Sequence, residues 1–303
     1  MLNAVIHREL QEQFGLRLKT GEPMCKHTSW RIGGPAEFFV EPENTLELQA
    51  VISLAKRRGL PLTVIGNGTN LLVGEKGISG IVLKIGPKMS RVSILGKDIL
   101  AEAGTRLSML ATIARDNNLG GLEFAAGIPG TVGGAVIMNA GANGASIGEL
   151  VKEVLLLDKE GHLCRRYGTD LNFNYRSTAL QRESAIVVEV KFSCFAREKH
   201  LIQSDMNSFI ARRLATQPQG QPNAGSVFKN PPGDSAGRLI EAAGLKSLRI
   251  GDAQVSDKHA NFIVNLGAAT SADVLSLIEK IKETVYNRFG VELLLEVQVV
   301  GDA

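Results

Sequence analysis

The sequence has few cysteines, no long apolar run and no run of basic residues. Its three cysteines, Cys25, Cys164 and Cys194, stand apart and show no metal-ligand spacing, which favours free thiols in a reducing compartment. No uncharged apolar stretch is long enough to cross a bilayer, so membrane insertion is not expected. With 34 Lys and Arg against 31 Asp and Glu, the charge does not indicate a nucleic-acid partner.

The first 14 residues also lack the features of a secretory signal. They carry Arg8, Glu9 and Glu12, with no apolar core and no small-residue cleavage site. We therefore expect a cytoplasmic protein. No internal repeat is present, and 303 residues suit two or three compact units.

Apolar periodicity predicts an α+β protein of three units, 1–87, 88–200 and 201–303. In the first unit, a helix over 44–58 ends at Gly59 and is followed by strands at 60–65 and 81–85. The second unit combines a helix and several strands, with Lys159-Glu160-Gly161 as a hairpin turn; these elements are predicted at 92–103, 106–117, 151–158, 162–166 and 186–194.

The third unit follows a linker at 195–200. Its elements are helices and two strands, at 201–215, 235–243, 261–265, 271–289 and 292–300. The helix over 271–289 has the clearest pattern, because Asp273 lies in its first turn and Gly290 follows its end.

Two glycine-rich loops carry the first functional signal. Gly66-Asn67-Gly68-Thr69-Asn70-Leu71 follows a predicted strand, and successive backbone N–H groups in such a turn can bind an anion. The loop is not a Rossmann fingerprint, since Leu71 occupies the third glycine position, and it lacks the Gly-Lys-Ser/Thr of a Walker loop. A purely structural turn is the alternative.

The second loop, residues 127–134, is richer in glycine. Gly127, Pro129, Gly130, Thr131, Gly133 and Gly134 belong to it, and Asn139 and Gly141 follow closely. So many glycines cost conformational entropy that a bare turn does not require, whereas close approach to a pyrophosphate does. The alternative is a close crossing of two backbones. Together the two loops predict a site for a dinucleotide cofactor.

The two loops resemble the FAD pyrophosphate loops of the vanillyl-alcohol-oxidase-type flavoprotein fold. Within it, the chain resembles the UDP-N-acetylenolpyruvoylglucosamine reductase family. The further matching motifs occur in family order over nearly the whole chain: Ser29-Trp30-Arg31-Ile32-Gly33-Gly34-Pro35, Asn174-Tyr175-Arg176-Ser177, Ala224-Gly225-Ser226-Val227-Phe228-Lys229-Asn230-Pro231 and Leu295-Glu296-Val297.

The resemblance implies a two-lobed FAD-binding module, followed by a C-terminal α/β substrate domain. It implies that NADPH reduces FAD, and that the enolpyruvyl group of UDP-N-acetylglucosamine enolpyruvate is then reduced to give UDP-N-acetylmuramate. This reaction belongs to peptidoglycan precursor synthesis, and so to cell-wall biogenesis, cell shape, the cell cycle and cell division. The five histidines lie outside both loops, so non-covalent FAD is expected.

Three residues match the family's catalytic positions. Arg176 would bind the substrate carboxylate, because a guanidinium fork suits a planar carboxylate; a surface arginine is the alternative. Ser226 would protonate C2, and a turn serine is its alternative. Glu296, in a predicted apolar strand, would be the acid if it faces inward, where burial would raise the pKa of its carboxyl; an outward-facing residue is the alternative.

Tyr175, Lys229 and Asn230 are the expected substrate contacts, with Arg212 and Arg213 as weaker candidates for its diphosphate. The chain departs from some family members because only 177–185 separates Arg176 from the next strand, without the extra tyrosine that closes over the substrate. It therefore resembles the shorter form of the family.

Two rival functions remain at this point. One is another FAD oxidoreductase of this fold, such as an oxidase of a small alcohol or sugar, which the Ser226 and Glu296 motifs disfavour. The other is a flavin- or nucleotide-binding module without catalysis, in which replacing Ser226 would change nothing measurable.

Overall fold

The computed structural model describes residues 2–301 and divides them into two compact units. Neither unit is continuous in sequence. Unit 1 comprises 1–19, 39–67 and 80–213, and unit 2 comprises 20–38, 68–79 and 214–303. The first glycine-rich loop is therefore divided: Gly66 and Asn67 belong to unit 1, and the residues from Gly68 onward belong to unit 2.

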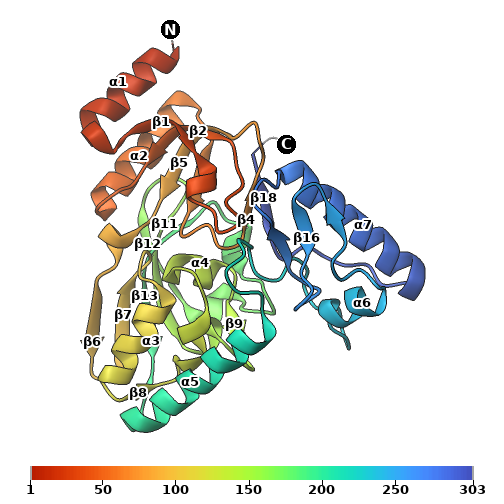
Figure 1. Cartoon of the computed structure of the whole chain (residues 1–303). Helices are drawn as coiled ribbons and strands as arrows, with labels where there is room; N and C mark the ends of the chain where they lie inside the picture. Colours follow the sequence, from red (N-terminus) through yellow and green to blue (C-terminus); the bar gives the residue numbers. More distant parts are fainter. Residues whose placement is uncertain (1, 302–303) are drawn as a thin grey trace. The chain divides into compact units, whose positions relative to one another are not determined.

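A five-stranded antiparallel sheet organises unit 1. Its order is β12-β11-β13-β7-β6. The bounds of these strands are Leu163–Tyr167 (β12), Val151–Leu157 (β11), Ile186–Ser193 (β13), Asp98–Glu102 (β7) and Val92–Leu95 (β6). The short helix α4 (Val132–Ile137), which carries the second glycine-rich loop, packs against β7 and β13 (Figure 1). The sheet thereby fixes the position of that loop.

Four helices and two pairs of short strands also begin in this part of the chain. The helices are α1 (Leu2–Phe14), α2 (Thr45–Arg58), α3 (Leu107–Asp116) and α5 (Lys199–Thr216), and the small paired strands are β8 (Leu119–Gly120) with β14 (Phe195–Ala196) and β9 (Gly141–Ala142) with β10 (Ala145–Ser146). Helix α2 begins at a capping side chain, since Asn44 Oδ1 accepts from Glu47 N at 3.0 Å, and ends at Gly59, whose φ is +63°.

A four-stranded sheet has the order β1-β2-β5-β3. Its strands are β1 (Lys19–Pro23), β2 (Pro35–Val40), β5 (Ile78–Lys84) and β3 (Leu62–Ile65). Strands β3 and β5 are parallel, with Leu62 opposite Ile81. Short 3₁₀ turns connect elements along the chain: Gly15–Arg17, Met24–Lys26, Pro87–Met89, Glu123–Gly127, Ile147–Glu149, Gly168–Leu171 and Ala179–Gln181.

Unit 2 is built around a three-stranded antiparallel sheet of order β15-β16-β17. Its elements are β15 (Arg249–Ile250), β16 (Ala253–Val255), β17 (Ile263–Asn265), α6 (Ala236–Ala242) and α7 (Ser271–Phe289), with β4 (Leu71–Val73) parallel to β18 (Gln298–Val300). Helix α7 packs on β15, β16 and α6 (Figure 1). A buried cluster that includes Trp30, Phe228 and Ile281 forms its core. This core places residues far apart in sequence in one packed body.

Most predicted elements are confirmed, and α7 has the predicted bounds. The hairpin at 159–161 is confirmed by the antiparallel pairing of β11 and β12. The expected linker at 195–200 is wrong: β14 pairs with β8 there, and α5 already begins at Lys199. Helix α4 is absent from the sequence prediction, because two of its six residues are glycines.

The predicted strand at 292–300 is mostly wrong, which changes the setting of Glu296. Only Gln298–Val300 pairs as a strand. Residues before it run as irregular chain with one isolated bridge, Phe228 to Leu295. The apolar residues there do not share one environment, since Leu293 is buried while Leu294 is exposed. Core packing and main-chain bonds to the 227–229 segment hold this stretch instead of a ladder.

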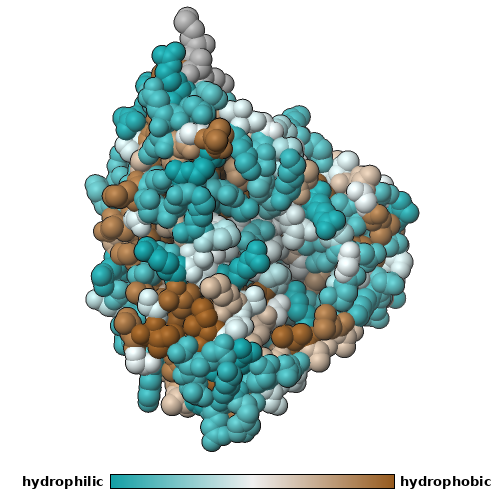
Figure 2. All heavy atoms as spheres, turned by 60° about the vertical axis from the view of Figure 1, so that its left-hand side comes forward, coloured by the Kyte–Doolittle hydropathy of each residue, from teal (hydrophilic) through white to brown (hydrophobic). Residues whose placement is uncertain are grey.

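Among residues 2–301, no helix combines the length and the apolar composition that a bilayer crossing requires. Figure 2 shows a face on which hydrophilic residues predominate, with an apolar area in its lower half. Large exposed apolar side chains such as Leu95, Met109 and Leu163 come from different elements.

Candidate flavin and substrate site

The two glycine-rich loops meet within unit 1. A Cβ atom on Gly66 would lie 2.5 Å from Thr131 Oγ1. Real Cβ atoms essentially never approach another heavy atom so closely, so the absence of a side chain at Gly66 is what allows the contact. The structure therefore brings together two loops that the sequence links only through their composition.

The rest of the first loop belongs to unit 2. Gly68 has a φ of +61°, and a Cβ there would overlap the carbonyl oxygen of His27. A close backbone crossing thus explains this glycine, in agreement with the structural alternative. Thr69 is half-buried, and Leu71 begins β4 opposite Gln298.

Asn70 ties this loop to the chain around Glu296. Its Nδ2 donates to the carbonyl oxygen of Glu296 at 3.0 Å, and its own carbonyl accepts from Gln298 N at 2.9 Å. The side chain of Asn70 therefore has a structural function beside the predicted cofactor contact. It fixes the main chain of the predicted acid.

The second loop is held by main-chain bonds to its neighbours in unit 1. Val132 N donates to Thr105 O at 2.8 Å, and Gly133 N donates to Ala103 O at 2.9 Å. A Cβ on Gly133 would approach Ala103 Cβ at 3.0 Å, so packing requires this glycine. Gly134 differs, because it is exposed and a Cβ there would meet nothing closer than 3.8 Å. Packing within the protein therefore does not account for Gly134.

Helix α5 places a cation beside this loop. A Cβ on Gly127 would lie 3.4 Å from Arg213 Cδ. Burial lowers the pKa of the Arg213 guanidinium below its ordinary value. Within residues 2–301, Arg213 forms no ion pair with a carboxylate. A half-buried cation without an anionic partner suits a diphosphate, so Arg213 is a stronger candidate than its sequence context suggests.

Tyr175 and Arg176 form the tip of a tight turn. Asn174 and Ser177 exchange main-chain hydrogen bonds of 2.9 and 3.1 Å on either side of it. Arg176 has a φ of +51°, a left-handed conformation that is uncommon for a residue with a side chain. Its Nη2 donates to Gly141 O at 3.0 Å, and its guanidinium lies 5.3 Å from the centre of the Tyr175 ring. Such a strained turn is typical of functional positions.

The buried side chain of Asn139 supports this turn. Its Nδ2 donates to Asn174 O at 2.7 Å, while its Oδ1 accepts from Gly148 N at 3.0 Å. The amide thus makes two internal hydrogen bonds. The predicted cofactor residues Asn139 and Gly141 therefore connect the glycine-rich loop to the turn that carries Arg176.

In unit 2, the segments that carry Ser226 and Glu296 run side by side. Glu296 N donates to Val227 O at 2.8 Å, and Lys229 N donates to Leu294 O at 2.8 Å. Both Ser226 and Glu296 are half-buried. Glu296 is therefore neither enclosed in the core nor fully exposed to solvent. The Ser226 hydroxyl has no hydrogen-bond partner among residues 2–301, so it is available to a ligand.

The two other predicted substrate contacts follow Ser226 along the chain. Lys229 is half-buried, with its main chain bound to Leu294. Asn230 is exposed, and its Oδ1 accepts from Ala236 N at 3.1 Å at the start of α6. The N-cap of α6 is Ser235, and Asn230 satisfies a further N–H group at the start of that helix, in addition to any contact with substrate.

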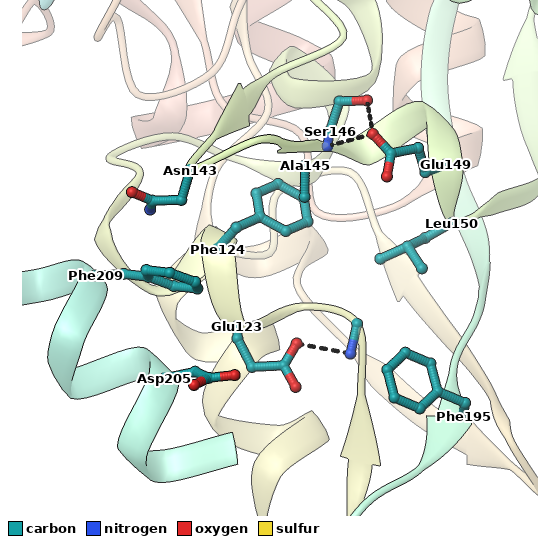
Figure 3. Close-up of a pocket in the computed structure, with 11 residues that line it drawn as sticks. Glu123, Phe124, Asn143, Ala145, Ser146, Glu149, Leu150, Phe195, Asp205 and Phe209 are labelled. Atoms are coloured by element: carbon teal, nitrogen blue, oxygen red, sulfur yellow. Dashed lines mark hydrogen bonds between the residues drawn. The ribbon is translucent and has the colours of Figure 1, made fainter. Parts of the chain in front are cut away.

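A pocket of about 280 Å³ lies in unit 1 beside α5 (Figure 3). Asp205 and Phe209 project from α5 toward Glu123 and Phe124. Arg197 binds both Glu123 and Asp205, at 2.7 Å each, and Glu149 adds a third carboxylate to the lining. The acidic lining makes this pocket unsuited to a diphosphate, whereas its aromatic rings offer stacking surfaces for a neutral ring. No sequence pattern indicates it.

These residues fit an FAD-type ligand in unit 1. The exposed backbone at Gly134 and the unpaired cation at Arg213 are the features that a pyrophosphate requires. From the sequence, Arg213 is only one residue of a predicted helix. The structure shows that it lies beside Gly127 of the second glycine-rich loop. Among residues 2–301, no group of three or more histidine, cysteine or acidic side chains is arranged to hold a metal ion.

Two known protein families match separate parts of the chain. Residues 36–166 match the FAD binding domain, and residues 217–300 match the C-terminal domain of UDP-N-acetylenolpyruvoylglucosamine reductase. A UDP-N-acetylenolpyruvoylglucosamine reductase of Desulforamulus reducens is 46% identical over 302 residues and covers 100% of each chain. One from Moorella thermoacetica is 47% identical over 97% of each chain.

Solved structures agree on the fold. The crystal structure of the Thermus caldophilus UDP-N-acetylenolpyruvylglucosamine reductase superposes with a TM-score of 0.83 at 36% identity, covering 93% of this chain and 98% of that one. A 4-ethylphenol oxidase from Gulosibacter chungangensis, 16% identical, has a TM-score of 0.51 over 97% of this chain and 65% of its own, which reflects the shared fold alone. The FAD-binding module is thus of the vanillyl-alcohol-oxidase type, followed by the reductase C-terminal domain. From its full-length identity to these reductases, the chain belongs to the UDP-N-acetylenolpyruvoylglucosamine reductase family.

Proposed function

We propose that Arg176, Ser226 and Glu296 perform the chemistry of this family's reaction in this chain. The protein is an FAD-dependent NADPH oxidoreductase. It reduces the enolpyruvyl group of UDP-N-acetylglucosamine enolpyruvate, which yields UDP-N-acetylmuramate for peptidoglycan synthesis. The side-by-side course of the Ser226 and Glu296 segments is the observation that supports the proposed residue roles most directly.

When bound, FAD would supply a hydride equivalent, obtained from NADPH, for C3 of the enolpyruvyl group. Negative charge then develops at C2 and on the substrate carboxylate. Arg176 is proposed to stabilise this charge, because its guanidinium is already oriented by Gly141 O and by the Tyr175 ring. A preoriented cation spends no reorganisation energy when the charge appears.

Ser226 is proposed to protonate C2. A serine hydroxyl is a weak acid, so a neighbouring group has to assist the transfer. The Glu296 carboxyl is the proposed assistant, since hydrogen bonds from Glu296 N to Val227 O and from Asn70 to Glu296 O hold the main chain of Glu296 beside the Ser226 segment.

The proposed cofactor residues are those of the two loops and the two positions that follow the second loop. Free backbone N–H groups among them would face the FAD pyrophosphate; Pro129 has no N–H, and Gly133 N already donates to Ala103 O. The full set is Gly66, Asn67, Gly68, Thr69, Asn70, Leu71, Gly127, Pro129, Gly130, Thr131, Gly133, Gly134, Asn139 and Gly141. Binding is proposed to be non-covalent, because no histidine lies in either loop.

Tyr175, Lys229 and Asn230 are proposed to bind the UDP-sugar, with Arg213 as an additional partner for a diphosphate. Tyr175 is exposed at the tip of its turn and can reach a ligand. The segment 177–185 after Arg176 contains no further tyrosine that could close over the substrate.

The division into an FAD-binding lobe at 1–87, a second lobe at 88–200 and a substrate domain at 201–303 is proposed as the functional order along the chain. The enzyme is proposed to act in the cytoplasm. Through peptidoglycan supply, it would contribute to cell shape and to the cell cycle and division.

An absorption experiment tests the proposed function. The purified protein should show a flavin spectrum that NADPH bleaches under anaerobic conditions. Adding UDP-N-acetylglucosamine enolpyruvate should restore it stoichiometrically. If the substrate left the bleached spectrum unchanged while oxygen or a simple alcohol substrate produced rapid turnover, the oxidase alternative would replace this proposal.

A further inference from the structure

The buried amide of Asn261 acts on the main chain next to Ser226. Its Nδ2 donates to Phe228 O at 2.8 Å, and its Oδ1 accepts from Phe228 N at 3.0 Å. The carbonyl of Asn261 also accepts from Val227 N at 2.9 Å. The Asn261 side chain therefore satisfies both the N–H and the C=O of buried Phe228, as the main chain of a neighbouring strand would.

The same segment is bound on its other side by the chain around Glu296. Val227 O accepts from Glu296 N at 2.8 Å, and Lys229 N donates to Leu294 O at 2.8 Å. Residues 227–229 are thus held between Asn261 and the 294–296 stretch. Loss of the Asn261 side chain would remove both hydrogen bonds to the main chain of Phe228, and would leave the segment held by core packing, the Val227 N–Asn261 O bond and the Glu296 side.

Ser226 lies at the edge of the restrained segment. Gly225 precedes it with a φ of +78°, a conformation that glycine adopts without restraint from a side chain. The Asn223 side chain accepts from Gly225 N at 3.0 Å on that side. The position of the Ser226 hydroxyl consequently depends on Val227 and Phe228, and through them on Asn261.

We propose that Asn261 is a positioning residue for proton transfer from Ser226. The inference rests on the proposed role of Ser226 as the proton donor. Asn261 itself touches neither substrate nor cofactor in this proposal. It sets where the hydroxyl stands relative to C2, and a displacement of about 1 Å at a reacting group can slow a reaction by about a hundredfold.

A matched control exists four residues further along the chain. Asn265 is buried to the same degree as Asn261, with 4% against 3% of its surface exposed. Its Nδ2 donates to Trp30 O at 3.0 Å, and its Oδ1 accepts from Gly267 N at 2.8 Å and Ala269 N at 3.0 Å. Asn265 therefore makes comparable bonds to main chain that does not carry Ser226.

The test compares the holoenzymes of Asn261→Asp and Asn265→Asp with wild type in the two half-reactions, by stopped-flow absorption. Both variants should lose thermal stability. Only Asn261→Asp should slow reoxidation of the flavin by the UDP-sugar, by about ten- to a hundredfold, while its reduction by NADPH keeps the wild-type rate. The solvent deuterium isotope effect on reoxidation should also rise, since proton transfer becomes more rate-limiting.

A protonation readout separates positioning from simple loss of stability. The carboxyl that Asn261→Asp introduces can again donate to Phe228 O once it is protonated, so reoxidation in this variant should recover as the pH is lowered, relative to Asn265→Asp. Equal slowing of both half-reactions, or equal effects of the two variants, would overturn the inference. If Ser226→Ala also left reoxidation unchanged, the proposed proton donor would be wrong, and not only the role of Asn261. If Asn261→Asp does not fold, Asn261→Ser, which keeps one hydrogen-bonding group, is measured in its place.

Discussion

Gly66 and Thr131 approach so closely that a Cβ on Gly66 would lie 2.5 Å from Thr131 Oγ1. The contact joins the start of the first glycine-rich loop to the second loop, at a point within unit 1. Any side chain at position 66 would force Thr131, and with it the start of α4, to move. This contact makes the shape of the proposed FAD cradle sensitive to a single methyl group.

Gly66→Ala should therefore lower the FAD content of the purified protein and destabilise it by about 1–3 kcal/mol, the usual cost of overpacking. The measurement is the ratio of flavin to protein absorbance, with thermal unfolding alongside. Gly86→Ala is the control, since a Cβ there meets nothing within 4 Å and φ is −117°. Equal FAD content in Gly66→Ala and wild type would contradict the proposed cradle.

Ser226→Ala should abolish most product formation while leaving flavin reduction by NADPH intact. Loss of a proton donor typically costs about 10²- to 10⁴-fold. Stopped-flow absorption separates the two half-reactions, and product is measured by chromatography. The variant is conservative in volume, and Ser226 has no hydrogen-bond partner among residues 2–301, so folding should be unaffected. Equal loss of both half-reactions would show that the serine is not the proton donor.

Arg213→Met should weaken the binding of a diphosphate ligand by about tenfold or more, because a charge-assisted contact to an unpaired cation is lost. FAD release by dilution and the KM for the UDP-sugar distinguish which ligand is affected. Arg212→Met, which removes the same charge at the neighbouring candidate, is measured in parallel to show which of the two arginines contacts the diphosphate. Unchanged binding of both ligands in Arg213→Met would remove this residue from the site.

FAD should leave the protein on denaturation. Acid precipitation followed by centrifugation is expected to give a yellow supernatant and a colourless pellet, because neither glycine-rich loop contains a histidine for covalent attachment. The free flavin is identified by chromatography against FAD and FMN standards. A yellow pellet after repeated washing would demonstrate covalent attachment instead.

His259 should make stability depend on pH. Burial lowers its pKa from the ordinary value of 6.5, with a smaller contribution from Lys246. Below that ordinary value, the unfolded chain binds a proton that the folded chain does not, so the free energy of unfolding should fall as the pH falls through the window beneath 6.5. Above it, His259 contributes no pH dependence. Urea unfolding of wild type and His259→Gln at several pH values checks this, and the variant should show a weaker decline.

Sequence patterns predict elements best where local signals agree. Helix α7 has the predicted bounds because Thr270 and Asp273 form a capping box at its start and Gly290 takes a φ of +67° at its end. Helix α4 has no such local signal, and its packing on β7 and β13 outweighs the poor helix propensity of glycine. Apolar composition at 292–297 similarly suggests a strand, but its partners are distant in sequence.

The candidate site follows the same rule. Motif order identifies Arg176, Ser226 and Glu296 as a set, because each motif is local. The supports of these residues are not local: Asn70 holds Glu296 from a loop more than two hundred positions earlier, and Arg213 reaches Gly127 from another element. Only the folded structure reveals such partners, since no regular spacing in the sequence connects them.

The discontinuous composition of unit 2 has a consequence for how the chain emerges from the ribosome. Segments 20–38 and 68–79 pack with 214–303, and β4 pairs with β18, which the ribosome makes much later than β4. At typical translation rates, the stretch between 79 and 214 takes on the order of ten seconds to synthesise. During that interval the early segments, including Trp30, which is buried in the folded protein, cannot yet pack against residues 214–303. Nascent chains stalled before residue 214 should therefore be more accessible to chaperones and proteases at these segments than the released protein.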